Sequence, residues 1–207
     1  MSKSYIAIPG KDEFEHQFGG HEWDMERCTL CKGDIHQLIT LDLQDPRLAA
    51  FRNPEAGMVP MVSCLNCSAS WWRQGYHIKN NLIQWEYQDI EEAEVMAEMD
   101  MIPTPLPVVS LKLEEYDDSD VEQFWKDFGT KFICKVGGDP IWAQDPVELT
   151  CPTCGKSMEF VAMIGGEQEE AEGKLIGKVR FGLGTCVYYY AVCPECGAIT
   201  VDCQERA

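Results

Sequence analysis

The sequence lacks any long hydrophobic run, although 45% of its 207 residues are hydrophobic. A membrane-spanning helix needs about 18 or more consecutive apolar residues, and no stretch approaches that length. The first residues, MSKSYIAIPGKDEFEH, also lack the extended apolar segment of a secretory signal peptide. The hydrophobic content is sufficient for a folded core. We therefore expect a globular, cytoplasmic protein with no membrane partner.

Basic residues are scarce as well. The chain has 17 Lys and Arg against 35 Asp and Glu, and its formal net charge is −18. A surface this acidic repels phosphate backbones and anionic lipids, which argues against nucleic acid as a partner. Two interpretations of the charge stay open: a solvated surface that keeps the protein soluble, or a surface that attracts a basic protein.

Sequence motifs of several enzyme classes are missing. There is no His-Glu-x-x-His, no Gly-x-Ser-x-Gly and no glycine-rich phosphate loop, and the zinc deaminase signature is incomplete because no His-x-Glu occurs. We therefore expect no catalytic residues.

Cysteine, by contrast, is abundant, and eight of the eleven cysteines fall into four Cys-x-x-Cys pairs. A disulfide within such a pair would close only a very short loop, whereas two pairs supply the four thiolates of a closed tetrahedral zinc site. We predict two zinc ions, one held by the first two pairs and one by the last two. Exchange of pairs between the sites is the alternative. The predicted ligands are Cys28, Cys31, Cys64, Cys67, Cys151, Cys154, Cys193 and Cys196.

The histidines and the three remaining cysteines are not the favoured zinc ligands. A histidine in place of one thiolate is the less favoured arrangement, because four cysteines already fill a tetrahedral shell. Cys134, Cys186 and Cys203 lie outside the pairs, and we predict that they are small buried hydrophobic residues.

The cysteine pairs belong to a pattern that occurs twice. In each half a Gly-Gly pair and a tryptophan precede the first Cys-x-x-Cys, and a spacer leads to the second. Counted from the last thiol of each first pair, apolar positions also match: Ile35, Leu38 and Leu41 with Met158, Val161 and Ile164. We interpret this as a duplicated supersecondary unit.

The predicted fold is α+β and mostly antiparallel β, with two zinc-ribbon-like knuckle pairs and a few short helices. The expected organisation is a first half over 1–87, an acidic connecting segment with helices over 88–130, and a second half over 131–207, together one compact pseudo-duplicated domain. We predict strands at 5–8, 35–43, 58–62, 69–73, 82–87, 108–113, 157–164, 174–183, 186–192 and 199–203. Helices are predicted after Asp45, from Asp89 to before Pro103, and after Ser119, which forms a capping box with Glu122.

The connecting segment concentrates acidic residues, which makes it the candidate surface for a basic partner. An aromatic anchor is expected beside it, because aromatic residues dominate the energy of many interfaces. For the tryptophan in this set, packing inside the protein is the alternative. The candidates are Glu91, Glu92, Glu94, Asp117, Asp118, Trp72 and Tyr189.

The segment KVGGDPIWAQDPVELTCPTCGKSMEFVAMI, followed by GLGTCVYYYAVCPECG, resembles the bacterial YwqG-like family and, more distantly, the eukaryotic programmed cell death protein 2 family. Both families show a Gly-Gly-x-Pro-x-Trp element, a Cys-x-x-Cys with a Leu/Met-rich strand downstream, and an aromatic strand that leads to another cysteine cluster. The resemblance covers 131–203 and the first half in outline, where Gly20-His21-Glu22-Trp23 lacks the proline. It implies a mostly β fold and a non-catalytic role. The eukaryotic relatives are chaperones of a basic ribosomal protein, and some bacterial relatives look like immunity proteins of toxin systems.

Together these features predict a non-enzymatic, zinc-stabilised protein-binding protein, monomeric when free. We expect an immunity protein that neutralises an intracellular toxin by stoichiometric binding. The first alternative is a chaperone for a basic client such as a ribosomal protein. The second is a thiol redox protein, because a Cys-x-x-Cys pair also occurs in redox motifs.

Overall fold

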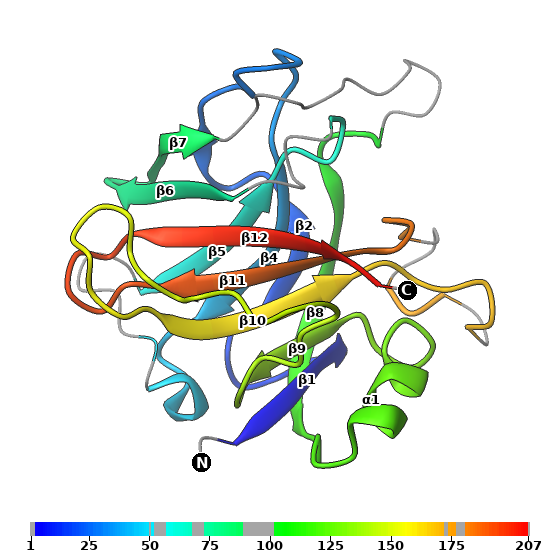
Figure 1. The fold of residues 1–207 in the computed structure, drawn as a ribbon. Helices are drawn as coiled ribbons and strands as arrows, with labels where there is room; N and C mark the ends of the chain where they lie inside the picture. The colour runs from blue at the N-terminus through cyan, green and yellow to red at the C-terminus, as the bar shows by residue number, and fades with distance from the viewer. Residues whose placement is uncertain are drawn as a thin grey trace.

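The computed structural model describes residues 3–49, 51, 57–67, 73–88, 102–171, 174–176 and 181–206. These residues form mostly antiparallel β-structure with few short helices (Figure 1). The elements are β1 Ser4–Pro9, β2 Gln17–Gly20, β3 Asp24–Met25, β4 His36–Asp42, η1 Pro46–Leu48, β5 Met58–Ser63, β6 Gln74–Lys79, β7 Leu82–Gln88, β8 Leu106–Glu115, α1 Val121–Asp127, β9 Cys134–Gly137, β10 Glu159–Gly165, β11 Cys186–Val192 and β12 Ile199–Glu205. Among the described residues, no helix has the length and apolar character needed to cross a membrane.

Most predicted strands are confirmed, with differences at their ends. The predicted strand over 174–183 is wrong, because its described parts, 174–176 and 181–183, lie in no strand. The sequence also gave no sign of β2, β3, β6 or β9. The predicted strand at 69–73 and the helix from Asp89 fall almost entirely outside the described residues.

The predicted helix starts need one correction. Asp45 caps a helix as expected: its side chain accepts a hydrogen bond from the backbone of Arg47, and the turn is a 3-10 helix of three residues. The second cap is Asp120 rather than Ser119. The Asp120 carboxylate accepts a hydrogen bond from the backbone N–H of Gln123 at 3.0 Å, which satisfies one of the free donors at the start of α1.

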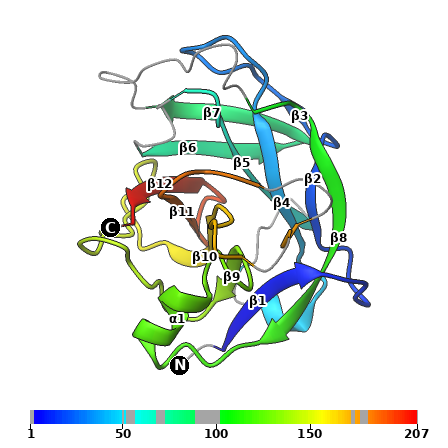
Figure 2. The same ribbon diagram turned by 90° about the vertical axis from the view of Figure 1, so that its right-hand side faces the viewer.

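Within the described residues, twelve strands form one sheet in the order β3-β7-β6-β12-β11-β10-β9-β1-β8-β2-β4-β5. The sheet curls, so that the wall made by β8, β2, β4 and β5 faces the wall made by β6, β12, β11 and β10 (Figure 2). The main hydrophobic core lies between the walls and includes Leu41 from one and Tyr190 from the other.

Strand β5 is an edge of this sheet, and tyrosine hydroxyls from the facing wall form hydrogen bonds with its backbone. The Tyr76 hydroxyl donates to the carbonyl of Pro60 at 2.8 Å and accepts from the N–H of Val62 at 3.4 Å. The Tyr190 hydroxyl donates to the carbonyl of Val62 at 3.3 Å. Buried backbone groups at an edge are thereby paired without another strand.

The strand order is pseudo-symmetric about the central β1–β8 pair. Strands β9, β10 and β11 follow β1 on one side, and β2, β4 and β5 follow β8 on the other, with antiparallel pairing throughout. We call β2-β4-β5 the first arm and β9-β10-β11 the second arm. Each arm pairs with the strand that precedes the other arm in the chain, because β1 precedes β2 yet pairs with β9, and β8 precedes β9 yet pairs with β2.

The registers of the two arms also agree. Phe18 lies opposite Ile39 in the first arm, and Val136 lies opposite Ala162 in the second. Each Gly-Gly pair that follows has positive φ angles: 70° and 98° at Gly19 and Gly20, and 70° and 65° at Gly137 and Gly138. Glycine adopts these angles at little cost.

A bulge occurs at the same place in both arms. The pairing of β4 with β5 shifts between Gln37 and Ile39, and the pairing of β10 with β11 shifts between Phe160 and Ala162. The residues at the two shifts are Leu38 and Val161, which the sequence comparison had matched.

Helix α1 makes the arms different. It lies beside β1 and β9 (Figure 2), where Phe124 and Phe128 join a second hydrophobic cluster with Met163 of β10 and Ile6 and Ile8 of β1. This cluster covers the face of the second arm that points away from the main core. The corresponding connection in the first arm, residues 10–16, contains no helix.

Candidate metal centres

Two groups of four thiols come together, with the grouping that the sequence predicted. In each group the four sulfur atoms lie within 4.8 Å of one another. Sulfur–sulfur distances in the first group are 3.6 Å for Cys28–Cys67, 3.5 Å for Cys31–Cys64 and 3.5 Å for Cys64–Cys67. In the second group they are 3.6 Å for Cys151–Cys196 and 3.5 Å for Cys154–Cys193. A tetrahedral ion with metal–sulfur bonds of about 2.3 Å places its ligand atoms about 3.8 Å apart, so each group fits one metal ion.

Three of the four knuckles share one backbone pattern. The backbone N–H of the first cysteine donates to the carbonyl of the residue five positions later. The N–H of the residue four positions later donates to the carbonyl of that first cysteine. The first set of distances is 3.0 Å for Cys28, 2.8 Å for Cys151 and 2.8 Å for Cys193, and the second set is 3.1, 2.8 and 2.9 Å. The fourth knuckle, Cys64–Cys67, runs on into residues outside the described ranges.

The turn of each of these knuckles requires a left-handed residue. Gly155 and Gly197 occupy that position with φ of 70° and 74°. In the first knuckle the position is Lys32, with φ of 59°. A residue with a side chain disfavours this conformation, so the backbone of the first knuckle is locally strained at Lys32 and contacts elsewhere must stabilise it.

In each group, hydrogen bonds favour the thiolate form of one cysteine. The pKa of Cys28 is held well below its usual range, because its sulfur accepts from the thiols of Cys64 and Cys67 and from backbone N–H groups in the knuckle. Burial raises the pKa of Cys151, but the N–H groups of Cys154 and Thr153 and the neighbouring thiols lower it further, to about 7. The pKa of Cys64 is raised, chiefly by its hydrogen bond with Cys28, and that of Cys196 is raised, chiefly by burial. Thiolates are the form of cysteine that binds metals.

The two groups differ in exposure. In the first group Cys31 is half-buried and the other three cysteines are buried. In the second group Cys151 and Cys193 are buried, Cys196 is half-buried and Cys154 is exposed. One ligand of the second group is therefore open to solvent.

The second group is attached to strands of the first half. The Thr153 hydroxyl donates to the Glu86 carboxylate on β7. His77 of β6 contacts the same carboxylate through Nδ1 at 2.8 Å, and its Nε2 lies 3.1 Å from the carbonyl of Cys196. These contacts join the C-terminal knuckles to the β6–β7 hairpin.

The first group is attached to the start of the segment before β8. Asn66, which lies between two ligands, accepts from the N–H of Ile102 at 2.7 Å and donates to its carbonyl at 3.0 Å. His36 Nε2 also lies 3.0 Å from that carbonyl, and its Nδ1 accepts from the N–H of Leu65 at 3.3 Å. Neither metal group among the described residues includes a histidine.

The predicted partner-binding residues lie in different environments. Asp117 is exposed, and its carboxylate accepts from the N–H of Ser119. Asp118 is half-buried and contacts other side chains: it accepts from the Ser4 hydroxyl at 2.5 Å and lies 3.2 Å from Lys135 Nζ. Glu91, Glu92, Glu94 and Trp72 lie outside the described residues.

Tyr189 requires a correction. Its side chain is 1% exposed, and its hydroxyl donates to the carbonyl of Ile141 at 3.1 Å and accepts from the N–H of Ala143 at 2.8 Å. Because it fills the core and its polar atom is satisfied, Tyr189 is not an anchor for a partner. Of the three unpaired cysteines, Cys134 and Cys186 are buried as expected and Cys203 is half-buried.

Sequence reasoning missed a cavity on the first arm. Its volume is about 590 Å³, and its lining includes Gln17, Glu22, Trp23 and Ser110. A second cavity of about 610 Å³ adjoins it and shares Trp23 with it. The lining comes from several strands and three connecting loops, so no local motif marks it in the sequence.

Comparison with known proteins gives little further information. No family model matches the chain, and no solved structure matches it. One stretch of 75 residues is 33% identical to "Uncharacterized protein YpfL" of Salmonella typhimurium strain LT2. The match covers 34% of this chain and 15% of that protein, so the chain spans a small part of the relative's length.

Proposed function

We propose that the protein holds two structural zinc ions and acts by binding a basic protein, as an immunity protein for an intracellular toxin. The observation that carries the proposal is the pair of closed four-thiol groups. Four soft thiolates in a tetrahedral arrangement suit zinc, and they leave no open coordination position for a substrate. The metal therefore stabilises the fold and is not a reaction centre.

Zinc in these positions would fasten distant parts of the chain. The first ion would join the knuckle before β4 to the end of β5, and the second would join the knuckle before β10 to the end of β11. Structural zinc sites contribute folding free energy on the order of 10 kcal/mol each. Both ions would stabilise the arms from which the curled sheet is built.

We also propose that the two arms are copies of one ancestral unit, each followed by a knuckle of the same kind. The shared register, the shared bulge and the paired glycines support this. It agrees with the resemblance to the YwqG-like and programmed cell death protein 2 families, which implies a non-catalytic role.

The net charge of −18 supports a basic partner, because charge complementarity speeds encounter and selects against acidic competitors. Affinity capture of the tagged protein from its native host, followed by co-expression of the captured chain in a naive cell, tests this. A toxic partner that this protein neutralises one-to-one supports the immunity function. Recovery of a nascent ribosomal protein would replace it with the chaperone, and turnover of a small molecule by the pure protein would defeat both.

A further inference from the structure

The cavity on the first arm opens on the face of β2 that points away from the main core. Gln17 lies opposite Ser110 on one neighbouring strand and Thr40 on the other, so three polar side chains form a row beneath the cavity. Glu15 and Glu22 add two exposed carboxylates to its lining, and Trp23 adds an aromatic ring. The Phe14 ring also lines the cavity, but the Arg47 guanidinium already lies 5.8 Å from its centre. The combination of two carboxylates and the Trp23 ring suits a cationic group.

The second arm shows what occupies the corresponding place there. Lys135 stands at the position of Gln17: each is the third residue before the second glycine, and each donates to the carbonyl of the first, Gln17 to Gly19 at 3.2 Å and Lys135 to Gly137 at 2.7 Å. Lys135 is fully buried.

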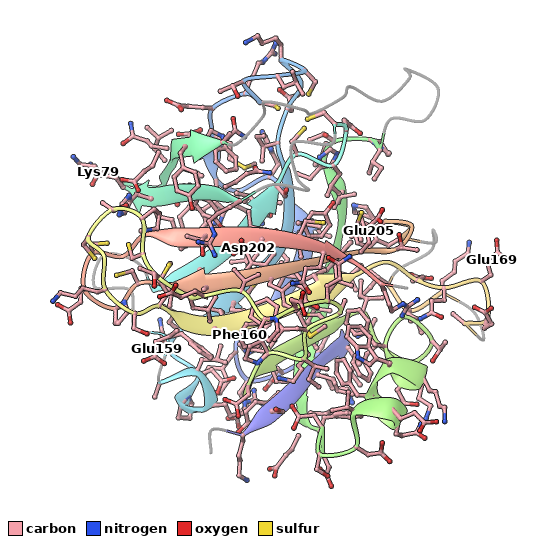
Figure 3. All side chains as sticks on the ribbon, viewed as in Figure 1. Lys79, Glu159, Phe160, Glu169, Asp202 and Glu205 are labelled. Carbon is pink, nitrogen blue, oxygen red and sulfur yellow. The ribbon has the colours of Figure 1, made fainter. Side chains whose placement is uncertain are left out.

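That buried ammonium neutralises a carboxylate. Lys135 Nζ lies 3.2 Å from Asp118 and 5.2 Å from the centre of the Phe160 ring (Figure 3 labels Phe160 on β10). Cation, carboxylate and aromatic ring thus form a complete set in the second arm.

In the first arm, no Lys or Arg of the described residues pairs with Glu22 in the way that Lys135 pairs with Asp118. The Glu22 carboxylate accepts from the side-chain amide of Gln37 at 2.7 Å. Burial raises the pKa of Glu22, but hydrogen bonds from Gln17, Gln37 and the backbone lower it below its usual value, so Glu22 is ionised at neutral pH. Among the residues that the structure describes, neither Glu22 nor Glu15 forms an ion pair.

Two other charged groups reach the cavity. Asp12 is neutralised by Arg47, whose Nη2 lies 2.6 Å away. Lys11 also lines the cavity, and with two free carboxylates it leaves one negative charge in excess. The cavity therefore carries a small net negative charge.

The outer faces of the two arms also differ in polarity. In the second arm Ile6 and Met163 flank Lys135, and α1 covers them. In the first arm Ser110 and Thr40 flank Gln17, and no helix in the described part of the chain covers them. A polar face beside carboxylates that have no ion pair is complementary to a basic side chain.

We infer that this cavity receives an arginine or lysine side chain of the basic partner, with Glu22 and Glu15 as its counter-charges and Trp23 as its apolar contact. The inference rests on the proposed function, because it assigns the site at which the partner is held. Trp23 belongs to the main core but, unlike Tyr189, also lines the cavity, so it takes the place of Tyr189 as the aromatic contact.

The test is a titration of the full-length, zinc-loaded protein with the peptide acetyl-Gly-Arg-Gly-Arg-Gly-amide, followed by NMR at the Trp23 indole N–H. The neutral counterpart with citrulline in place of arginine is the ligand control. We expect Glu22→Gln to weaken binding about tenfold or more, as loss of one charged hydrogen bond requires. Glu15→Gln should act in the same direction, and Lys11→Gln should strengthen binding.

Glu159→Gln and Glu205→Gln are the matched controls, because they remove the same charge at exposed positions on β10 and β12 (Figure 3). Zinc content and the dispersion of the amide spectrum show whether each variant is folded. Ser110→Arg offers a second route, since an arginine on β8 should occupy the cavity and exclude the peptide. Equal binding of the citrulline peptide, or equal weakening by the control variants, would overturn the inference.

Capture experiments with the partner distinguish the proposed binding site from the proposed function. Capture of a basic partner that Glu15→Gln/Glu22→Gln leaves unchanged would refute the cavity as its site and keep the proposed function. Failure of the wild-type protein to capture any basic partner, with the peptide results as expected, would refute the proposed function and keep a cavity selective for arginine.

Discussion

At the scale of single residues, the left-handed position of the knuckle turn holds lysine in the first half and glycine in the second. Lys32 has φ of 59° where Gly155 and Gly197 stand in the other turns, so Lys32→Gly should stabilise the holoprotein by up to about 1 kcal/mol. Gly155→Ala should cost about 1 kcal/mol; no atom crowds the new Cβ, so the effect is conformational. Denaturant unfolding with excess zinc measures both. A destabilising Lys32→Gly would show that its side chain, not its backbone, matters to the turn.

The cysteine ligands could be predicted because a Cys-x-x-Cys knuckle is local: both thiols come from one turn. Tyr189 could not be assigned correctly from the sequence. Three consecutive tyrosines on a strand suggest alternate exposure, but both faces of β11 are covered, one by the main core and one by the cluster beneath α1. The contact of Asp118 with the buried Lys135 could not be predicted either, because it depends on the packing of the fold.

At the scale of elements, the edge strand β5 depends on side chains of the facing wall. Tyr76→Phe would leave the carbonyl of Pro60 and the N–H of Val62 unpaired in a buried place, which should cost about 1–3 kcal/mol. Tyr190→Phe removes one longer contact to the Val62 carbonyl and should cost less. Hydrogen exchange at Val62 N–H should become faster in Tyr76→Phe and change little in Tyr190→Phe. Similar exchange in both variants would contradict this account of the edge.

The long strands were predictable because their apolar runs lie in one continuous segment. Strands β2 and β9 were not, since each has four residues and ends at glycine, a residue that disfavours strands. They are strands because they pair on both sides, with β8 and β4 or with β1 and β10. The pairings of β2 with β8 and of β9 with β1 join residues that are far apart in the chain, such as Gln17 with Ser110 and Tyr5 with Val136, and no local pattern predicts them.

At the scale of the whole molecule, the exchange of β1 and β8 between arms makes the two halves depend on each other. Fragments divided within residues 89–101 would each lack the central strand that their arm requires. We expect residues 1–95 and 96–207 to be insoluble when expressed separately, and soluble and zinc-loaded when co-expressed. Independent folding of either fragment would contradict this. The duplicated motif was visible in the sequence, but the strand exchange and the cavity were not, because both arise from pairing across the chain.

The central claim is that two closed thiolate groups each hold a structural zinc ion, and native mass spectrometry of the purified protein tests it most directly. We predict two zinc ions per chain, and one in Cys154→Ser, whose exposed ligand is the least disruptive of the eight to replace. Removal of both ions with a chelator should unfold the protein, because each site contributes on the order of 10 kcal/mol. A folded, soluble chain that carries no metal would contradict the account.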